Sequence, residues 1–217
     1  MAGTPTEEVW LETSDRLRLE AELVVPDDAW AGSLLCHPHP TQGGSMRSMV
    51  TGHQFRMLPH HGVACLRFNF RGVERSDGSH GGGRPERLDV LAGLGALFEV
   101  IEGLPLVLAG WSFGADTSLS VVDERIDGWC ATAPPLRVFP PDELIAGPDP
   151  RPKLLVVPEN DQFRPPERLD EIIAGWAATE VRMSPGTDHF LVGRLDDAVD
   201  GVTSLARALA EPHARDY

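Results

Sequence analysis

Basic residues are scarce in this chain. Its 217 residues include 19 Lys and Arg against 33 Asp and Glu, which gives a formal net charge of −14. A protein with this charge repels polyanions at long range. The composition therefore argues against nucleic acid and anionic membrane surfaces as partners.

The chain also has no long hydrophobic run and only three cysteines. No apolar run approaches the roughly 18 residues of a membrane span, and Glu7 and Glu8 stand where a signal peptide needs a basic start. The odd number of cysteines, each inside an apolar run, favours buried thiols over a disulfide framework; they are Cys36, Cys65 and Cys130. We therefore expect a cytoplasmic protein with no membrane segment.

Aromatic residues make up only 6% of the chain, but the 41% of hydrophobic residues is enough to build a globular core. No charge run, Ser-rich spacer or internal repeat marks a boundary between two folding units. We expect one domain over residues 1–217.

Short apolar runs alternate with segments of helical periodicity. The runs are typical of buried parallel strands and cover residues 33–36, 63–70, 106–109, 129–133 and 153–157. Apolar residues at helical spacing follow Pro85, Pro165 and Leu195. Residues 8–25 alternate, which predicts an edge strand whose solvent-exposed face carries Arg16, Arg18, Glu20 and Glu22. The sequence thus predicts an α/β fold with a mostly parallel central sheet, an antiparallel N-terminal edge and helices on both faces.

A serine lies where one of these strands meets a helix. Gly110-Trp111-Ser112-Phe113-Gly114 follows the apolar run 106–109 and has the pattern of a nucleophile elbow. In such a turn, side chains two residues before or after the serine would collide with neighbouring backbone, so glycine is needed there. We interpret Ser112 as a nucleophile; the alternative is a glycine-rich turn with an inert serine.

A nucleophilic serine needs a base, and in this architecture an acid and then a histidine follow it along the chain. Asp161 lies just beyond the run 153–157 and is the predicted acid, with Glu159 as the local alternative. A further strand is predicted near residues 180–183, and His189, which follows it, is the predicted general base. The neighbouring Asp188 is interpreted as a loop or capping residue.

The developing oxyanion needs backbone N–H donors. One comes from the residue after the nucleophile, Phe113. The second is expected from the loop that follows the run 33–36, where Pro38 and Pro40 lack an N–H and leave His39 as the donor between them. An alternative hypothesis makes His37 and His39 a metal pair, but a Ser-His-Asp site needs no metal and no cofactor.

Three motifs in order resemble the compact, dienelactone-hydrolase-like group of serine hydrolases with the α/β-hydrolase fold. They are His-Pro-His-Pro with Gly-Gly at 37–44, Arg-Phe-Asn-Phe-Arg-Gly at 67–72 and Gly-x-Ser-Phe-Gly-Ala at 110–115. The resemblance implies a triad, matched by Ser112, Asp161 and His189, and hydrolysis of an ester or similar acyl bond. The chain departs from the group at Glu74, where a glycine is usual, and it carries serine rather than the cysteine nucleophile of true dienelactone hydrolases.

The remaining motif residues have structural or binding interpretations. Asn69 and Arg71 are expected to tie loops together by hydrogen bonds. The aromatic residues beside the predicted triad either line an acyl pocket or pack in the core; they are Trp111, Phe163 and Phe190.

These observations predict a serine hydrolase that cleaves small carboxylic esters. A thioesterase or amidase with the same triad, and a non-catalytic binding protein that keeps the fold, are the alternatives. Residues 134–152 hold seven prolines and are too short for a multi-helix cap, so we expect an open cleft that takes a small-molecule acyl substrate.

Overall fold

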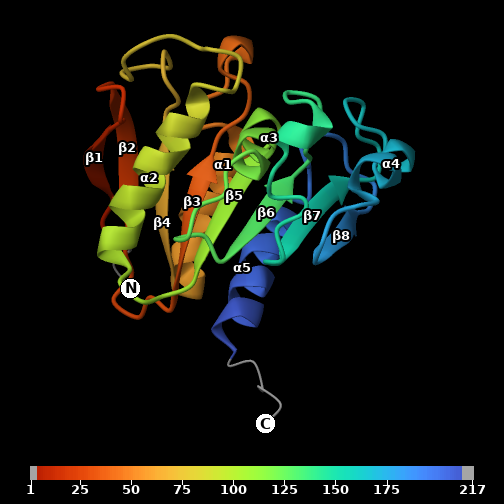
Figure 1. The fold of residues 1–217 in the computed structure, drawn as a ribbon. Helices are drawn as coiled ribbons and strands as arrows, with labels where there is room; N and C mark the ends of the chain where they lie inside the picture. The colour runs from red at the N-terminus through yellow and green to blue at the C-terminus, as the bar shows by residue number, and fades with distance from the viewer. Residues whose placement is uncertain (1–3, 212–217) are drawn as a thin grey trace.

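Eight strands form one sheet in the computed structural model, which describes residues 4–211 (Figure 1). The spatial order is β1-β2-β4-β3-β5-β6-β7-β8. The strands β1 and β2 pair antiparallel, β2 joins β4 antiparallel, and all remaining pairs are parallel. The bounds are β1 Glu7–Glu12, β2 Arg18–Val24, β3 Ala31–Cys36, β4 Val63–Phe68, β5 Leu106–Trp111, β6 Gly128–Thr132, β7 Lys153–Pro158 and β8 Thr179–Ser184. The predicted sheet with its antiparallel N-terminal edge is confirmed.

Helices cover both faces of the sheet, as predicted (Figure 1). One face packs against α2 and α3 and the other against α1 and α5, and a separate apolar core fills each interface. The bounds are α1 Met49–Met57, α2 Glu86–Val100, α3 Phe113–Leu119, α4 Asp170–Ile173 and α5 Asp196–Ala210. Short 3-10 helices are η1 Pro40–Gln42, η2 Leu58–His61, η3 Pro141–Glu143 and η4 Pro166–Arg168.

The helix expected after Pro165 is shorter than its apolar spacing suggests. Only η4 and the single turn of α4 form there. Beyond this turn Trp176 packs on Gly147, where an added Cβ would lie 2.6 Å from the indole nitrogen. Residues 134–152 contain only η3, so the predicted absence of a multi-helix cap is confirmed.

The three cysteines are free and buried, as the sequence predicts. Desolvation raises the pKa of Cys36 and of Cys130 to about 12, so both thiols stay protonated. Within residues 4–211, no helix has the length and apolarity needed to cross a membrane.

The prediction that Glu20 and Glu22 on β2 are exposed to solvent is wrong. Glu20 is 3% exposed and Glu22 is 8% exposed. Arg75 Nη2 lies 2.7 Å from Glu20 Oε1, and Arg67 Nε donates to Glu22 Oε2 at 2.8 Å. Burial acts in the opposite direction, but hydrogen bonds from Arg75 and Asn69 lower the pKa of Glu20 to about 2. The alternation predicts which residues share a face, but Arg67 on β4 and Arg75 in the loop after β4 cover that face.

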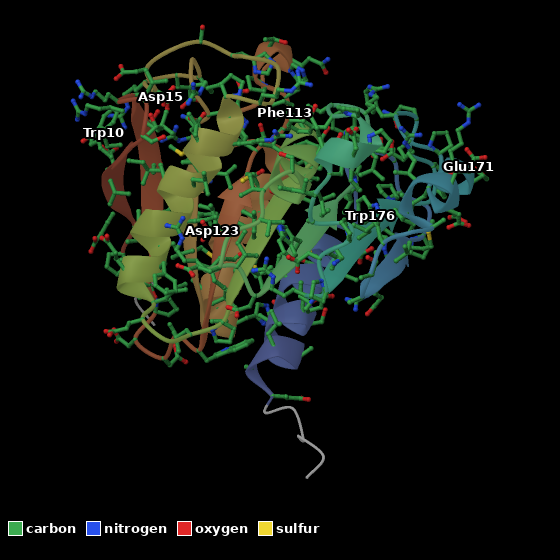
Figure 2. The ribbon with its side chains drawn as sticks, in the orientation of Figure 1. Trp10, Asp15, Phe113, Asp123, Glu171 and Trp176 are labelled. Atoms are coloured by element: carbon green, nitrogen blue, oxygen red, sulfur yellow. The ribbon has the colours of Figure 1, made fainter. Side chains whose placement is uncertain are left out.

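Figure 2 locates this charged edge, with Trp10 and Asp15 labelled at the side of the sheet formed by β1 and β2. Trp10 is 43% exposed, and the guanidinium groups of Arg18 and Arg75 lie over its ring at 4.6 and 5.5 Å. The arginines therefore shield the aromatic edge as well as pairing with carboxylates.

A buried histidine ties the ends of β3 and β4 together. His37 Nδ1 lies 2.6 Å from the carbonyl oxygen of Pro38, so this nitrogen carries the proton. Its Nε2 accepts the backbone N–H of Phe70 at 3.0 Å. Burial lowers the pKa of His37 to about 3, so the ring is neutral in the folded protein.

We expect this buried ring to make stability depend on pH. Because unfolded histidine takes up a proton near pH 6.5 and folded His37 does so only near pH 3, the free energy of unfolding should fall as pH drops between these values. The contribution is at most about 1.4 kcal/mol per pH unit. Urea unfolding of the wild type and of His37→Asn, which cannot titrate, measures it.

The variant should show a shallower pH dependence and a stability at pH 7 lower by about 1–3 kcal/mol, because the Phe70 N–H loses its acceptor. His61→Gln, at an exposed position, is the matched control and should keep the wild-type slope. Equal slopes for wild type and His37→Asn would contradict the assignment.

Candidate active site

The turn between β5 and α3 is tightly constrained. Ser112 at its apex has φ 56° and ψ −120°, a conformation that non-glycine residues rarely adopt. A Cβ on Gly110 would lie 2.3 Å from the carbonyl oxygen of Gly114, and a Cβ on Gly114 would lie 2.2 Å from that of Cys36. The predicted need for glycine at both positions is confirmed.

The structure brings the three predicted polar residues into one hydrogen-bonded chain. Ser112 Oγ lies 2.8 Å from His189 Nε2, and His189 Nδ1 lies 2.8 Å from Asp161 Oδ2. Both contacts are satisfied when Nδ1 carries the proton and donates to Asp161, which leaves Nε2 to accept from the serine. Glu159, the alternative acid, instead accepts the backbone N–H of Gly186 at 2.7 Å.

Surrounding groups hold the acid and the imidazole in place. Asp161 Oδ1 accepts the backbone N–H groups of Phe163 and Arg164 at 2.7 and 3.1 Å. The indole nitrogen of Trp111 donates to the carbonyl oxygen of His189 at 3.0 Å. The Phe163 ring centre is 4.5 Å from that of the imidazole. Asp161 is 3% exposed and His189 4%, so their mutual hydrogen bond is shielded from water.

The two predicted oxyanion donors belong to neighbouring segments. Phe113 begins α3, and its ring centre is 5.0 Å from that of His39. The carbonyl oxygen of Pro38 accepts from the His37 ring, and the described peptide bonds are all trans. In a trans peptide the N–H points opposite to the carbonyl, so His37 fixes the direction of the His39 N–H.

The alternative that His37 and His39 hold a metal ion does not fit this geometry. The Nδ1 of His37 is protonated, and the lone pair of its Nε2 is used by the N–H of Phe70. A metal needs a free imidazole lone pair. In the described part of the chain, no group of three or more His, Cys, Asp or Glu could hold a metal ion.

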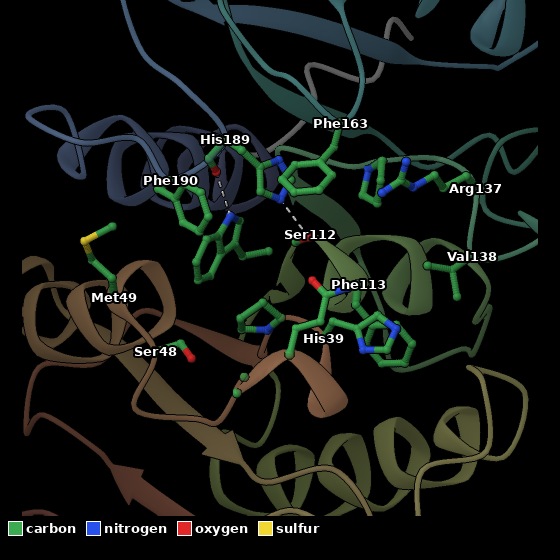
Figure 3. Close-up of a pocket in the computed structure, with 16 residues that line it drawn as sticks. His39, Ser48, Met49, Ser112, Phe113, Arg137, Val138, Phe163, His189 and Phe190 are labelled. Atoms are coloured by element: carbon green, nitrogen blue, oxygen red, sulfur yellow. Dashed lines mark hydrogen bonds between the residues drawn. The ribbon is translucent and has the colours of Figure 1, made fainter.

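A cavity of about 360 Å³ opens above Ser112 (Figure 3). The three predicted aromatic residues line it together with His39 and His189. Trp111 also packs in the core between the sheet and α5, so both interpretations hold for it. Lining residues that the sequence did not indicate include Met49, Arg137 and Val138. They come from loops and from the start of α1, whose position next to Ser112 no sequence spacing reveals.

The unusual glutamate in the loop after β4 adopts the conformation normally left to glycine. Glu74 has φ 49°. Its carboxylate accepts from Arg47 Nη1 at 2.5 Å and from Asn69 Nδ2 at 3.0 Å, and these contacts offset the strain. Arg71 pairs with Asp89 at 2.7 Å. The predicted structural roles of Asn69 and Arg71 are therefore confirmed.

Comparison with known proteins relates the fold of this chain to hydrolases. No family model matches the chain. An uncharacterized protein of Rickettsia prowazekii is 27% identical over 168 residues, which cover 73% of this chain and 71% of that protein.

Two solved structures share the whole architecture. An α/β serine hydrolase homologue from Coxiella burnetii is 28% identical with a TM-score of 0.81, covering 96% of this chain and 99% of that one. A serine hydrolase without lid from Xanthomonas campestris is 25% identical with a TM-score of 0.81, covering 96% and 97%. The chain therefore has the α/β-hydrolase fold without a lid, and these similarities support a hydrolase.

Proposed function

We propose that this protein is a serine hydrolase that cleaves small carboxylic esters through an acyl-enzyme intermediate. The observation that carries the proposal is the 2.8 Å contact between Ser112 Oγ and His189 Nε2, with Asp161 on the opposite ring nitrogen. A serine hydroxyl in this environment has a base positioned to take its proton, which is the requirement for nucleophilic attack.

The proposed reaction runs in two halves. His189 removes the Ser112 proton as Oγ attacks the acyl carbonyl, and Asp161 stabilises the imidazolium that forms. The N–H groups of Phe113 and His39 stabilise the oxyanion, and His189 then protonates the leaving alcohol. Water, activated by His189 in the same way, releases the acid and restores Ser112. None of these steps needs a metal or a cofactor.

The subgroup, compartment and partner are parts of the same proposal. The motifs at 37–44, 67–72 and 110–115 support a dienelactone-hydrolase-like enzyme. The net charge of −14 supports a small-molecule substrate over nucleic acid or a membrane surface. We propose a cytoplasmic location on the grounds of the free, buried cysteines.

We expect a fluorophosphonate probe to label the protein once, on Ser112. Only a serine with an adjacent base reacts readily with this probe. Intact-mass measurement should find one adduct on the wild type and none on Ser112→Ala. Ser48→Ala, which removes another hydroxyl from the same cavity, is the matched control and should still be labelled. A folded wild-type protein without an adduct would favour the non-catalytic alternative.

The choice between the two carboxylates is tested by amide substitutions. Asp161→Asn should lower kcat by about 10³–10⁴-fold, because Asp161 holds the imidazole tautomer that accepts the serine proton. Glu159→Gln removes the charge of a side chain that contacts the loop at Gly186, keeps an oxygen that can accept the same N–H, and should change kcat less than about twofold. Steady-state hydrolysis of 4-nitrophenyl butyrate measures both. A larger loss of kcat in Glu159→Gln than in Asp161→Asn would show that Glu159 is the acid.

The uncapped cavity predicts a preference for short acyl chains. With a volume of about 360 Å³ and no cap over it, a long chain stays partly in water and forfeits about 0.8 kcal/mol for each methylene left unburied. Values of kcat/KM for 4-nitrophenyl esters should peak at about two to six acyl carbons. A peak at long chains, or a jump in rate above the micelle concentration, would contradict this expectation.

A further inference from the structure

The cavity differs in charge from the rest of the molecule. Acidic residues outnumber basic ones in the sequence by 33 to 19, yet the sixteen residues that line the cavity include no aspartate or glutamate. They include one arginine, Arg137. The lining thus supplies a cationic group and no carboxylate of its own, which favours an anion in this cavity.

The side chain of Arg137 has no anionic partner. It forms no ion pair with any carboxylate in the described range 4–211, whereas Arg71, Arg84 and Arg87 each pair with an acidic side chain. Its guanidinium carbon lies 5.3 Å from the centre of the Phe163 ring, which leaves the N–H groups at the edge of the guanidinium available. The charge is therefore held beside the ring that contacts His189.

Buried groups fix the backbone that carries this arginine. Asp116, which is fully buried, accepts the N–H groups of Leu136, Arg137 and Val138 at 2.8, 2.9 and 3.0 Å. Arg164 donates from the other side to the carbonyl oxygen of Leu136 at 3.2 Å. Leu136 has φ 47°, a strained value that these contacts maintain.

The cavity has two unlike sides about Ser112 (Figure 3). Met49 and Phe190 lie on one side and are apolar. Arg137 lies on the other side, together with Val138. An ester bound with its carbonyl at Ser112 thus extends in one direction along apolar side chains and in the other toward a cation.

We propose that Arg137 binds a carboxylate at one end of the substrate, so that the natural ester is apolar on one side of the scissile bond and anionic on the other. This inference rests on the proposed function. Guanidinium binds carboxylate with two parallel N–H donors, and hydrogen bonds to charged groups are stronger than neutral ones. We expect the carboxylate to raise kcat/KM by about tenfold over an uncharged isostere.

Two pairs of substrates test the proposal from both sides of the scissile bond. The first pair varies the acyl half. One substrate is the 4-nitrophenyl monoester of adipate, and the other is the 4-nitrophenyl ester of adipamate, in which a carboxamide replaces the free carboxylate. In the second pair the leaving group is 4-hydroxybenzoate or 4-hydroxybenzamide, esterified with butyrate. The wild type should prefer the carboxylate in one pair, which identifies the half of the ester that faces Arg137.

Substitutions at Arg137 test whether this residue causes the preference for the carboxylate substrate. Arg137→Gln should reduce the carboxylate-to-carboxamide ratio of kcat/KM to about one, and Arg137→Lys should keep an intermediate ratio because it retains the charge but not the planar donors. Arg207→Gln changes the net charge equally at an exposed position on α5 and should leave the ratio at its wild-type value. Ratios near one in both wild-type pairs, or a wild-type ratio in Arg137→Gln, would overturn the inference.

A second readout does not depend on turnover. Free adipamate, which carries one carboxylate, should slow fluorophosphonate labelling of wild-type Ser112 more than neutral adipamide does, and this difference should vanish in Arg137→Gln. Equal protection by both compounds in the wild type, with labelling intact, would overturn the carboxylate site and leave the proposed hydrolase standing. Absence of labelling together with absence of turnover would overturn the proposed function, and the inference with it.

Discussion

The close approach of three backbone segments at the elbow determines the rest of the site. The turn at Ser112 can form only because Gly110 and Gly114 let β5, α3 and the end of β3 come within contact distance of one another. The positive φ of Ser112 costs about 1–3 kcal/mol, which the packing of both fully buried flanking elements must offset. In this conformation Ser112 lines the cavity and its Oγ lies within hydrogen-bond distance of His189 Nε2.

The other groups of the site reach Ser112 because parallel strands end at the same edge of the sheet. The loops after β3, β7 and β8 supply His39, Asp161 and His189, and each is fixed by contacts that do not involve Ser112. His37 orients the loop after β3, two backbone N–H groups hold Asp161, and Trp111 holds the backbone of His189. The geometry is therefore in place before a substrate binds, which is the condition for electrostatic stabilisation without reorganisation.

Local pattern predicted much of this structure, and the failures have a common cause. The buried strands and the glycine requirements around Ser112 follow from hydrophobic runs and steric limits that act within a few residues. The burial of Glu20 and the presence of Arg137 in the cavity depend on residues more than twenty positions away, Arg75 and Asp116. Periodicity indicates which side chains share a face, but only tertiary packing determines what covers that face.

The helix α3 connects Ser112 with the loop that carries Arg137. It begins directly after Ser112, and one turn later Asp116 binds three consecutive N–H groups of the loop that carries Arg137. Asp116 accepts from these backbone N–H groups and Asp161 pairs with His189, and neither carboxylate forms an ion pair with the guanidinium of Arg137. A buried acid thus ties the backbone of Arg137 to the helix that begins after Ser112. In a protein with a net charge of −14, the carboxylate proposed above would meet long-range repulsion, and Arg137 would offset that repulsion inside the cavity that Ser112 also lines.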